Sequence, residues 1–227
     1  MKKAVILISG GIDSTTVLAM AIDQGYEVYP ISFTYGQKHD VEIKKAIESA
    51  KLFKIKNHKI INLDARAFCG SALTDSSIEI PKYKDKDELG EVIPVTYVPA
   101  RNTIFLSLAL GYAETLNAYD IFIGVHAQDY SNYPDCRPEF IKAFEEMANL
   151  GVKYTTKEER VKIHTPIINM DKAEIIKIGI KLGVDYSNTI SCYDATPEGL
   201  SCGTCHPCLL RKDAFEKNNI ADPTLYR

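Results

Sequence analysis

The amino-acid sequence predicts an α/β protein: a parallel sheet with helices on both faces, followed by a small C-terminal metal-binding subdomain. Two observations predict this fold class. Mostly apolar strand-like segments alternate with helical patterns, which is typical of parallel strands buried on both faces. From Ser191 onward, closely spaced cysteines replace the aliphatic periodicity. We therefore expect a main domain over residues 1–185 and a subdomain over residues 186–227.

The individual elements follow from hydrophobic pattern and from glycines at helix ends. Strands are expected over residues 3–8, 27–33, 58–63 and 119–124, with a shorter strand over 162–165. Helices are expected over residues 14–24, 41–53, 102–117, 139–150 and 172–182. Gly25, Gly151 and Gly183 directly follow three of these helices, where the left-handed conformation that ends a helix favours glycine.

One long segment, residues 66–97, interrupts this alternation with prolines, mixed charges and no clean period. A connection of this length inside a compact domain is usually a lid or a mobile loop. We expect a lid that excludes water from a reactive intermediate.

The overall composition excludes several classes of protein. With 27 basic and 30 acidic residues the net charge is −3, so there is no general electrostatic attraction to nucleic acid, and no nucleic-acid partner is expected. The apolar runs are too short for a membrane span, and the apolar stretch after Met1 is too short for a signal peptide. We expect a cytoplasmic protein.

The stretch Ile8-Ser-Gly-Gly-Ile-Asp-Ser-Thr15 joins the first expected strand to the first expected helix. Free amides and the helix dipole favour an anion at such a junction, and glycines let a phosphate approach the main chain. Hydroxyl groups of Ser9, Ser14 and Thr15 add donors, and Asp13 either caps the helix or helps to hold Mg²⁺. The alternative is a tight turn in which Asp13 and Ser14 only cap. The stretch matches neither a Walker A loop nor a G-x-G-x-x-G turn.

This stretch resembles the pyrophosphate loop, S-G-G-x-D-S, of the ATP pyrophosphatase group, which includes GMP synthetase, NAD synthetase, asparagine synthetase and several tRNA-modifying enzymes. The resemblance implies that ATP is cleaved between its α and β phosphates and that AMP is placed on a substrate oxygen. The adenine is expected over the end of the second strand, near Ser32, Phe33 and Thr34. The expected ATP-binding residues are Ile8, Ser9, Gly10, Gly11, Ile12, Asp13, Ser14, Thr15, Ser32, Thr34, Arg101 and Asn102.

Arg101 and Asn102, in the run Val-Pro-Ala-Arg-Asn, open the third expected helix. A cation at a helix N-terminus opposes the helix dipole, and a bound anion would reverse that penalty. We expect Arg101 to neutralise charge on the phosphates, with Asn102 as a cap or a phosphate donor. The alternative is a solvated arginine whose stem covers apolar surface.

Residues 124–140 follow the fourth expected strand, at the edge of the sheet where ligands of parallel sheets bind. Carboxylates can accept the paired donors of a guanine-like edge, and a tyrosine ring can stack on a purine. The expected substrate-binding residues are Asp129, Tyr130, Tyr133, Asp135 and Arg137. In the alternative interpretation, Asp135 caps the following helix and the tyrosines pack. Cys136 is interpreted as packing, and no catalysis is assigned to His126.

Cys192, Cys202, Cys205 and Cys208 supply four thiolates with C-x-x-C spacing. This pattern favours a closed tetrahedral zinc site that stabilises the fold. An iron–sulfur cluster would also use four cysteines, and a C-x-x-C redox pair would leave two unexplained.

Taken together, these motifs and Phe33-Thr-Tyr-Gly-Gln-Lys-His-Asp-Val-Glu-Ile43 resemble one family over residues 1–212, the 7-cyano-7-deazaguanine synthases (QueC) of queuosine biosynthesis. The resemblance implies that 7-carboxy-7-deazaguanine and ammonia become a nitrile through two adenylations by MgATP, in a homodimer with one structural Zn²⁺ per chain. The implied catalytic residues are Asp13, Arg101, Asp129 and Asp135. The competing interpretations are a tRNA-thiolating enzyme with the same adenylation chemistry and a zinc-ribbon adaptor without catalysis.

Overall fold

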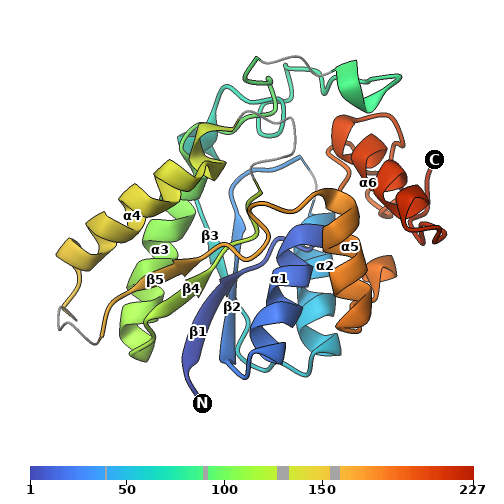
Figure 1. Ribbon diagram of the computed structural model, residues 1–227. Coiled ribbons are helices and arrows are strands. Elements are labelled where there is room, and N and C mark those ends of the chain that lie inside the picture. Colours follow the sequence, from blue (N-terminus) through green and yellow to red (C-terminus); the bar gives the residue numbers. More distant parts are fainter. Residues whose placement is uncertain (39, 89–91, 127–132, 154–158) are drawn as a thin grey trace.

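The computed structural model describes residues 1–38, 40–88, 92–126, 133–153 and 159–227. Its centre is a sheet of five parallel strands in the order β3-β2-β1-β4-β5 (Figure 1). The strands are β1 (Lys3–Leu7), β2 (Glu27–Thr34), β3 (Lys59–Asn62), β4 (Asp120–Phe122) and β5 (Lys162–His164). The parallel sheet that the sequence predicts is confirmed.

The central strand β1 supplies both faces of the sheet. Val5 and Leu7 belong to one hydrophobic core, whereas Ala4, Ile6 and Ile8 belong to a second one. Successive side chains of a strand point to opposite faces, so an uninterrupted apolar run fits a strand that is covered on both sides.

Helices cover the two faces as expected (Figure 1). The first core packs beneath α3 and α4, and the second packs beneath α1, α2 and α5. The five helices are α1 (Ile12–Asp23), α2 (Val41–Leu52), α3 (Arg101–Leu116), α4 (Pro138–Gly151) and α5 (Lys172–Lys181). All five helices predicted from the sequence are present, with ends shifted by a few residues.

A sixth helix, α6 (His206–Lys217), was not predicted from the sequence. It packs on α5 at the outer side of the second core, to which it contributes Ala214 and Phe215. The helix also buries Arg211, which donates to the Tyr186 carbonyl and to the Thr189 hydroxyl, both at 2.9 Å. An arginine at a core position breaks the apolar period by which a helix is recognised. The boundary expected between residues 185 and 186 stays a prediction.

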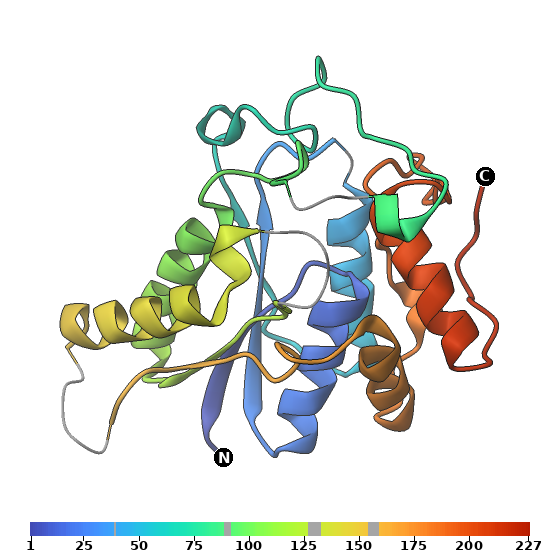
Figure 2. The same ribbon diagram turned by 45° about the horizontal axis from the view of Figure 1, so that its top comes forward.

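The described parts of the segment 66–97, residues 66–88 and 92–97, lie over the carboxyl end of the sheet, and residues 83–86 reach the C-terminal region (Figure 2). The Tyr83 amide donates to the Thr204 carbonyl over 2.8 Å, and Lys86 forms an ion pair of 2.6 Å with Asp213. The structure therefore describes a segment that is tied to α6 and to the cysteine-rich tail. Its expected action as a lid stays a prediction.

The strand order reverses at β1, since β2 lies on one side of it and β4 on the other. Ligands of open parallel sheets bind at such a switch point, beyond the carboxyl ends of the strands. The chain segments that leave β1 and β4 therefore border the most favourable place for a site. Within the described residues, no helix is long and apolar enough to cross a membrane.

Candidate active site

A cavity of about 270 Å³ lies at this switch point. Its walls come from the loop after β1, the ends of β2 and β4, the start of α3, the start of α5 and the C-terminal tail. Segments distant in sequence thus converge on one space, which is large enough for most of a nucleotide-sized ligand to be buried.

The loop after β1 forms one wall of the cavity, and α1 begins within it at Ile12. The hydroxyl of Ser14 accepts a hydrogen bond from the Ser9 amide at 3.1 Å and lies 3.1 Å from the Ser9 hydroxyl. Gly11 is the N-cap, and no side chain caps the helix. The interpretation of Asp13 and Ser14 as mere caps is therefore wrong. The predicted loop residues that line the cavity are Ile8, Ser9, Gly11, Ile12, Asp13 and Ser14.

Two glycines let backbone segments approach the start of α1. Gly10 has a φ of +82°, and a Cβ there would lie 2.3 Å from the Glu42 carbonyl oxygen of α2. A Cβ on Gly124, just after β4, would lie 3.0 Å from the Ser14 amide nitrogen. Gly10 is thus required for packing against α2 and does not itself line the cavity, and neither does Thr15.

Asp13 is the centre of a charged group that also contains Lys172 and His126. The Lys172 ammonium lies 2.8 Å from each Asp13 carboxylate oxygen, and His126 Nε2 lies 3.4 Å from Asp13 Oδ2. Burial raises the pKa of Asp13, but the charge of Lys172 and the contacts with Lys172 and His126 outweigh it and hold the pKa well below the usual range of a carboxyl. Asp13 is therefore an anion at neutral pH. All three residues line the cavity.

Arg101 is the first residue of α3 and lies across the cavity from the loop after β1. Its Nη1 donates to the Tyr35 hydroxyl at 3.1 Å, and the Tyr35 ring packs edge-on against Phe68 and Phe105. Among the described residues, no carboxylate lies within ion-pair distance of Arg101. A neutral hydroxyl thus holds the guanidinium in position, and its positive charge remains available to bind an anion.

Asn102 and Asp135 join the start of α3 to the segment that precedes α4. The Asp135 carboxylate accepts from the Asn102 amide at 3.0 Å, and Asn102 Nδ2 donates to the Asp135 carbonyl at 3.1 Å. Asp135 therefore caps α3 and not α4, whose N-cap is Arg137. Its carboxylate does not line the cavity, whereas Asn102 does. Burial raises the pKa of the adjacent Cys136 thiol to about 12. Cys136 also lines the cavity, and its interpretation as a packing residue stays a prediction.

Of the three residues expected near the adenine at the end of β2, only Phe33 faces the cavity. Ile31 and Phe33 line it, and the Phe33 ring stacks on Phe105 with centroids 4.1 Å apart. Ser32 points to the opposite face, where its hydroxyl donates to the Ile8 carbonyl at 2.6 Å. Thr34 donates to Asn62 Oδ1 at 2.6 Å. Neither Ser32 nor Thr34 lines the cavity, so the structure gives their side chains no direct part in holding ATP.

The expected substrate segment is described only in part. Asp129 and Tyr130 lie outside the described residues. Tyr133 lines the cavity, and its hydroxyl lies 2.9 Å from Thr96 Oγ1. Arg137 is exposed and does not line the cavity.

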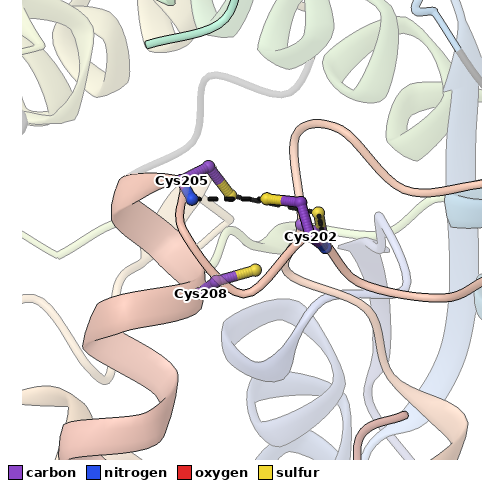
Figure 3. Close-up of side chains that lie close together, drawn as sticks. Cys202, Cys205 and Cys208 are labelled. Carbon is purple, nitrogen blue, oxygen red and sulfur yellow. Dashed lines mark hydrogen bonds between the residues drawn. The ribbon is translucent and has the colours of Figure 1, made fainter. Parts of the chain in front are cut away.

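The four predicted cysteine ligands converge at the start of α6. Their sulfurs all lie within 4.8 Å of one another, and Figure 3 shows the Cys202, Cys205 and Cys208 sulfurs directed at one space. The amides of Asp194 and Cys202 donate to the Cys192 sulfur at 3.3 and 3.2 Å, which suits a thiolate. This donor set fits a tetrahedral metal ion held by four soft ligands.

The cysteine cluster also builds a wall of the cavity. Ser191 and Tyr193, which flank Cys192, line the cavity, and so do His206 and Pro207 between Cys205 and Cys208. The cysteine-rich tail thus forms part of the wall of this cavity.

Sequence reasoning missed several residues of the site. Lys172 carried the same signal as Arg101, a cation at the first position of a helix that starts beyond a strand of the sheet. His126 and Gly124 lie directly beyond β4, where the sheet edge favours a site. Tyr35 belongs to the run 33–43 that carries the resemblance, but no signal indicated its role, and Tyr193 had no signal at all. Only the fold brings Tyr35 to Arg101 and Tyr193 to the cavity.

Comparisons with known proteins agree on one family. A family model described as queuosine biosynthesis protein QueC matches residues 3–219. The chain is 62% identical over 226 residues to the 7-cyano-7-deazaguanine synthase of Rickettsia bellii (strain OSU 85-389), covering 100% of this chain and 99% of that protein. It is 61% identical over 226 residues to the 7-cyano-7-deazaguanine synthase of Rickettsia felis, covering 100% of both.

A solved structure supports the fold independently of close sequence similarity. The NMN synthetase from Francisella tularensis has a TM-score of 0.51 and 15% identity, and the match covers 96% of this chain and 77% of that chain. Together with the family model and the two relatives, the fold and the loop after β1 lead to one conclusion: the chain belongs to the QueC family of queuosine biosynthesis proteins.

Proposed function

We propose that this chain converts 7-carboxy-7-deazaguanine and ammonia to 7-cyano-7-deazaguanine with consumption of ATP, as the names of its relatives and its family indicate. The single observation that carries the proposal is the placement of the S-G-G-x-D-S loop, Arg101 and Lys172 around one cavity. An adenylating enzyme needs this combination of main-chain amides and fixed cations around a triphosphate.

The chemistry requires two activations of the same substrate carbon. A carboxylate is a poor electrophile because its leaving group would be oxide. Transfer of AMP to the carboxylate turns that oxygen into a good leaving group, and ammonia then displaces AMP to form an amide. A second adenylation on the amide oxygen lets this oxygen depart with AMP, which leaves the nitrile. One cavity can serve both rounds if the substrate stays in place.

The phosphates are assigned to the start of α1. Ser9, Gly11 and Ser14 offer amide and hydroxyl donors there, and Arg101 faces them from α3. Lys172 is paired with Asp13 in this structure. When MgATP binds, Asp13 is the residue suited to hold Mg²⁺, because it is an anion in the first turn of α1, directly after the loop. Mg²⁺ would then take the place of Lys172 beside Asp13, and the Lys172 ammonium would pair with a phosphate oxygen.

The rings of the two substrates are assigned to different walls. The stacked pair of Phe33 and Phe105, with Ile31, offers the adenine an apolar wall at the end of β2. The deazaguanine is assigned to the segment from residue 126 to Arg137, from which Tyr133 reaches the cavity. Asp129 and Tyr130 remain candidates for reading its edge. Asp135 acts indirectly, since its carboxylate fixes the first turn of α3 that carries Arg101.

The four-cysteine cluster is assigned to one Zn²⁺ per chain. Four protein thiolates leave no open coordination position, so the ion stabilises the tail and the cavity wall beside it. The remaining expectations are a homodimer, a cytoplasmic location and the absence of a nucleic-acid partner. The net charge of −3 supports only the last of these.

One assay tests the function. Purified protein is incubated with 7-carboxy-7-deazaguanine, ammonium and MgATP, and the products are identified by mass spectrometry. The expected products are the nitrile, AMP and pyrophosphate. Asp13→Ala and Arg101→Ala are expected to abolish turnover while zinc stays near one per chain. Wild-type protein that forms no nitrile and thiolates tRNA in its place would overturn the proposal.

A further inference from the structure

A second, much smaller cavity adjoins the main one. Its volume is about 20 Å³, and three of its lining residues, Tyr133, Tyr193 and His206, also line the main cavity. These three side chains form the partition between the two spaces. The other lining residues of the small cavity come from the segment over the sheet and are Pro81, Tyr83, Pro94 and Thr96.

The small cavity matches a ligand with a single non-hydrogen atom. A buried space of about 10–15 Å³ holds one water-sized molecule, so this cavity has no room for a nucleotide or a heterocycle. Its lining nevertheless contains several hydroxyl groups. Thr96 Oγ1 lies 2.9 Å from the Tyr133 hydroxyl, which lies 3.4 Å from the Tyr193 hydroxyl. A row of three hydroxyls therefore leads from the small cavity to the main one.

The charges nearby favour a neutral molecule over a cation. No carboxylate is among the described residues that line the small cavity. The Arg101 guanidinium, held by Tyr35, is close enough for its charge to act on the Tyr133 and Tyr193 hydroxyls. A tyrosine hydroxyl donates one hydrogen bond, so the Tyr133 and Tyr193 hydroxyls at the partition can donate to a lone pair.

We propose that this small cavity, bordered by Thr96, Tyr133, Tyr193 and His206, is the binding site from which ammonia enters the reaction. The inference deepens the proposed function and rests on it. Ammonia is as small as water, and it accepts one hydrogen bond through its lone pair while donating three. The hydroxyl row offers both kinds of partner, and the nearby arginine disfavours the ammonium ion, which has no lone pair to attack with.

The step that this site serves is the displacement of AMP from the acyl-adenylate by ammonia. The nitrogen lone pair of ammonia forms a C–N bond to the carbon of the acyl-adenylate. The C–O bond to AMP breaks, and AMP leaves with that electron pair. One proton departs from nitrogen to solvent, and the amide remains. No oxidant or further reactant is needed.

The first experiment removes one polar group from the small cavity. Thr96→Val keeps the shape of a residue that is 7% exposed and that does not line the main cavity. We expect the KM for ammonium to rise about tenfold, as the loss of one buried hydrogen bond predicts. The KM values for ATP and for the carboxylate substrate are expected to change less than twofold. Thr224→Val is the matched control, since its buried hydroxyl has no partner among the described residues.

The second experiment enlarges the small cavity. Thr96→Ala removes a methyl and a hydroxyl, which makes room for methylamine in place of ammonia. We expect this variant to raise the ratio of kcat/KM for methylamine to that for ammonia at least tenfold over wild type. The N-methyl amide is detected by mass spectrometry, and it cannot proceed to the nitrile. If both Thr96 variants fold, as judged by thermal melting, yet keep the wild-type ammonium KM and amine preference, the site is refuted.

A separate measurement distinguishes failure of this site from failure of the proposed function. Exchange of labelled pyrophosphate into ATP, dependent on 7-carboxy-7-deazaguanine and without ammonia, reports the adenylation alone. Wild-type protein without this exchange refutes the proposed function. Normal exchange in wild type and in both Thr96 variants, together with the changed amine kinetics, supports the ammonia site.

Discussion

The ammonium group of Lys172 lies 2.8 Å from both carboxylate oxygens of Asp13, although the two residues are 159 positions apart in the chain. The pair joins the first turn of α1 to the first turn of α5 across the cavity. Asp13 is favoured by the dipole of its helix, whereas Lys172 is disfavoured by the dipole of its own. A cation in that position is stabilised by an anion in front of it, which is Asp13 in this structure and a phosphate in the proposed complex.

Replacement of Lys172 by methionine tests this pair. Because the pKa of Asp13 is lowered in the folded protein, the pair stabilises the fold above pH ~4, the usual carboxyl pKa, and this contribution is lost as the pH falls further. Lys172→Met should lower the free energy of unfolding by about 1–3 kcal/mol at pH 7. The difference from wild type should shrink below pH ~4.

Urea unfolding at pH 7 and at pH 3 measures both effects. Lys177→Met, on the exposed face of the same helix, is the control and should change the stability by less than about 0.5 kcal/mol at either pH. Equal losses in the two variants would contradict the pairing.

The hydrogen bond from Arg101 to Tyr35 predicts a positioning effect on catalysis. Tyr35→Phe keeps the ring that packs on Phe68 and Phe105 but removes the acceptor of the guanidinium. We expect kcat to fall about tenfold or more, because Arg101 loses its orientation toward the charge that develops on the phosphates. The KM for ATP should change little.

Steady-state kinetics separates the two constants. Tyr29→Phe, on the strand β2 that directly precedes Tyr35, is the matched control, because the Tyr29 hydroxyl donates to Glu27 and Tyr29 does not line the cavity. A Tyr35→Phe enzyme with unchanged kcat would show that Arg101 needs no such support.

Much of this fold was readable from the sequence because its elements obey simple periods. The central strands are apolar on both faces, and α1 to α5 carry apolar stripes between glycines and turns. Helix α6 was missed for a physical reason. It buries Arg211 through hydrogen bonds to Tyr186 and Thr189. The spacing of apolar residues in a sequence does not predict a buried arginine.

The site was predictable where main-chain chemistry decides and unpredictable where side-chain direction decides. The loop after β1 follows from two glycines after a strand. On β2, by contrast, polar residues were chosen for the nucleotide, but strand alternation points Ile31 and Phe33 at the cavity and Ser32 away from it. The partners of Asp13 and Arg101 are far away in the sequence, so only the packed fold identifies Lys172 and Tyr35.

Gly124 makes a prediction about the approach of β4 to α1. A Cβ there would lie 3.0 to 3.1 Å from backbone atoms of Asp13 and Ser14, and backbone cannot swing aside as a side chain can. Gly124→Ala should therefore push the start of α1 away, with a loss of about 1–3 kcal/mol in stability. Activity should also fall by a larger factor than the fraction of folded protein does.

Gly111→Ala is the matched control for this substitution. Gly111 lies inside α3 with nothing near its ideal Cβ, so alanine should stabilise the helix by about 0.5–1 kcal/mol. Circular dichroism melting and the nitrile assay on both variants provide the measurements. If Gly124→Ala and Gly111→Ala had the same Tm and the same activity, the segment after β4 and the start of α1 would not be in close contact.

The cysteine cluster predicts that metal, stability and active-site shape change together. Cys205 is fully buried, and its replacement by serine removes one of four converging sulfurs. Cys205→Ser should lose most of the one zinc expected per chain and about 3 kcal/mol or more of stability, which lowers Tm by about 6–12 °C in a chain of this size. Because His206 and Pro207 lie between two of the ligands and line the cavity, the KM for the carboxylate substrate should rise as well.

Cys69→Ser, at an exposed cysteine outside the cluster, should keep metal, Tm and KM unchanged. Metal analysis, calorimetry and kinetics on the two variants measure this coupling, and a Cys205→Ser protein that retains its metal would show that fewer than four sulfurs hold it.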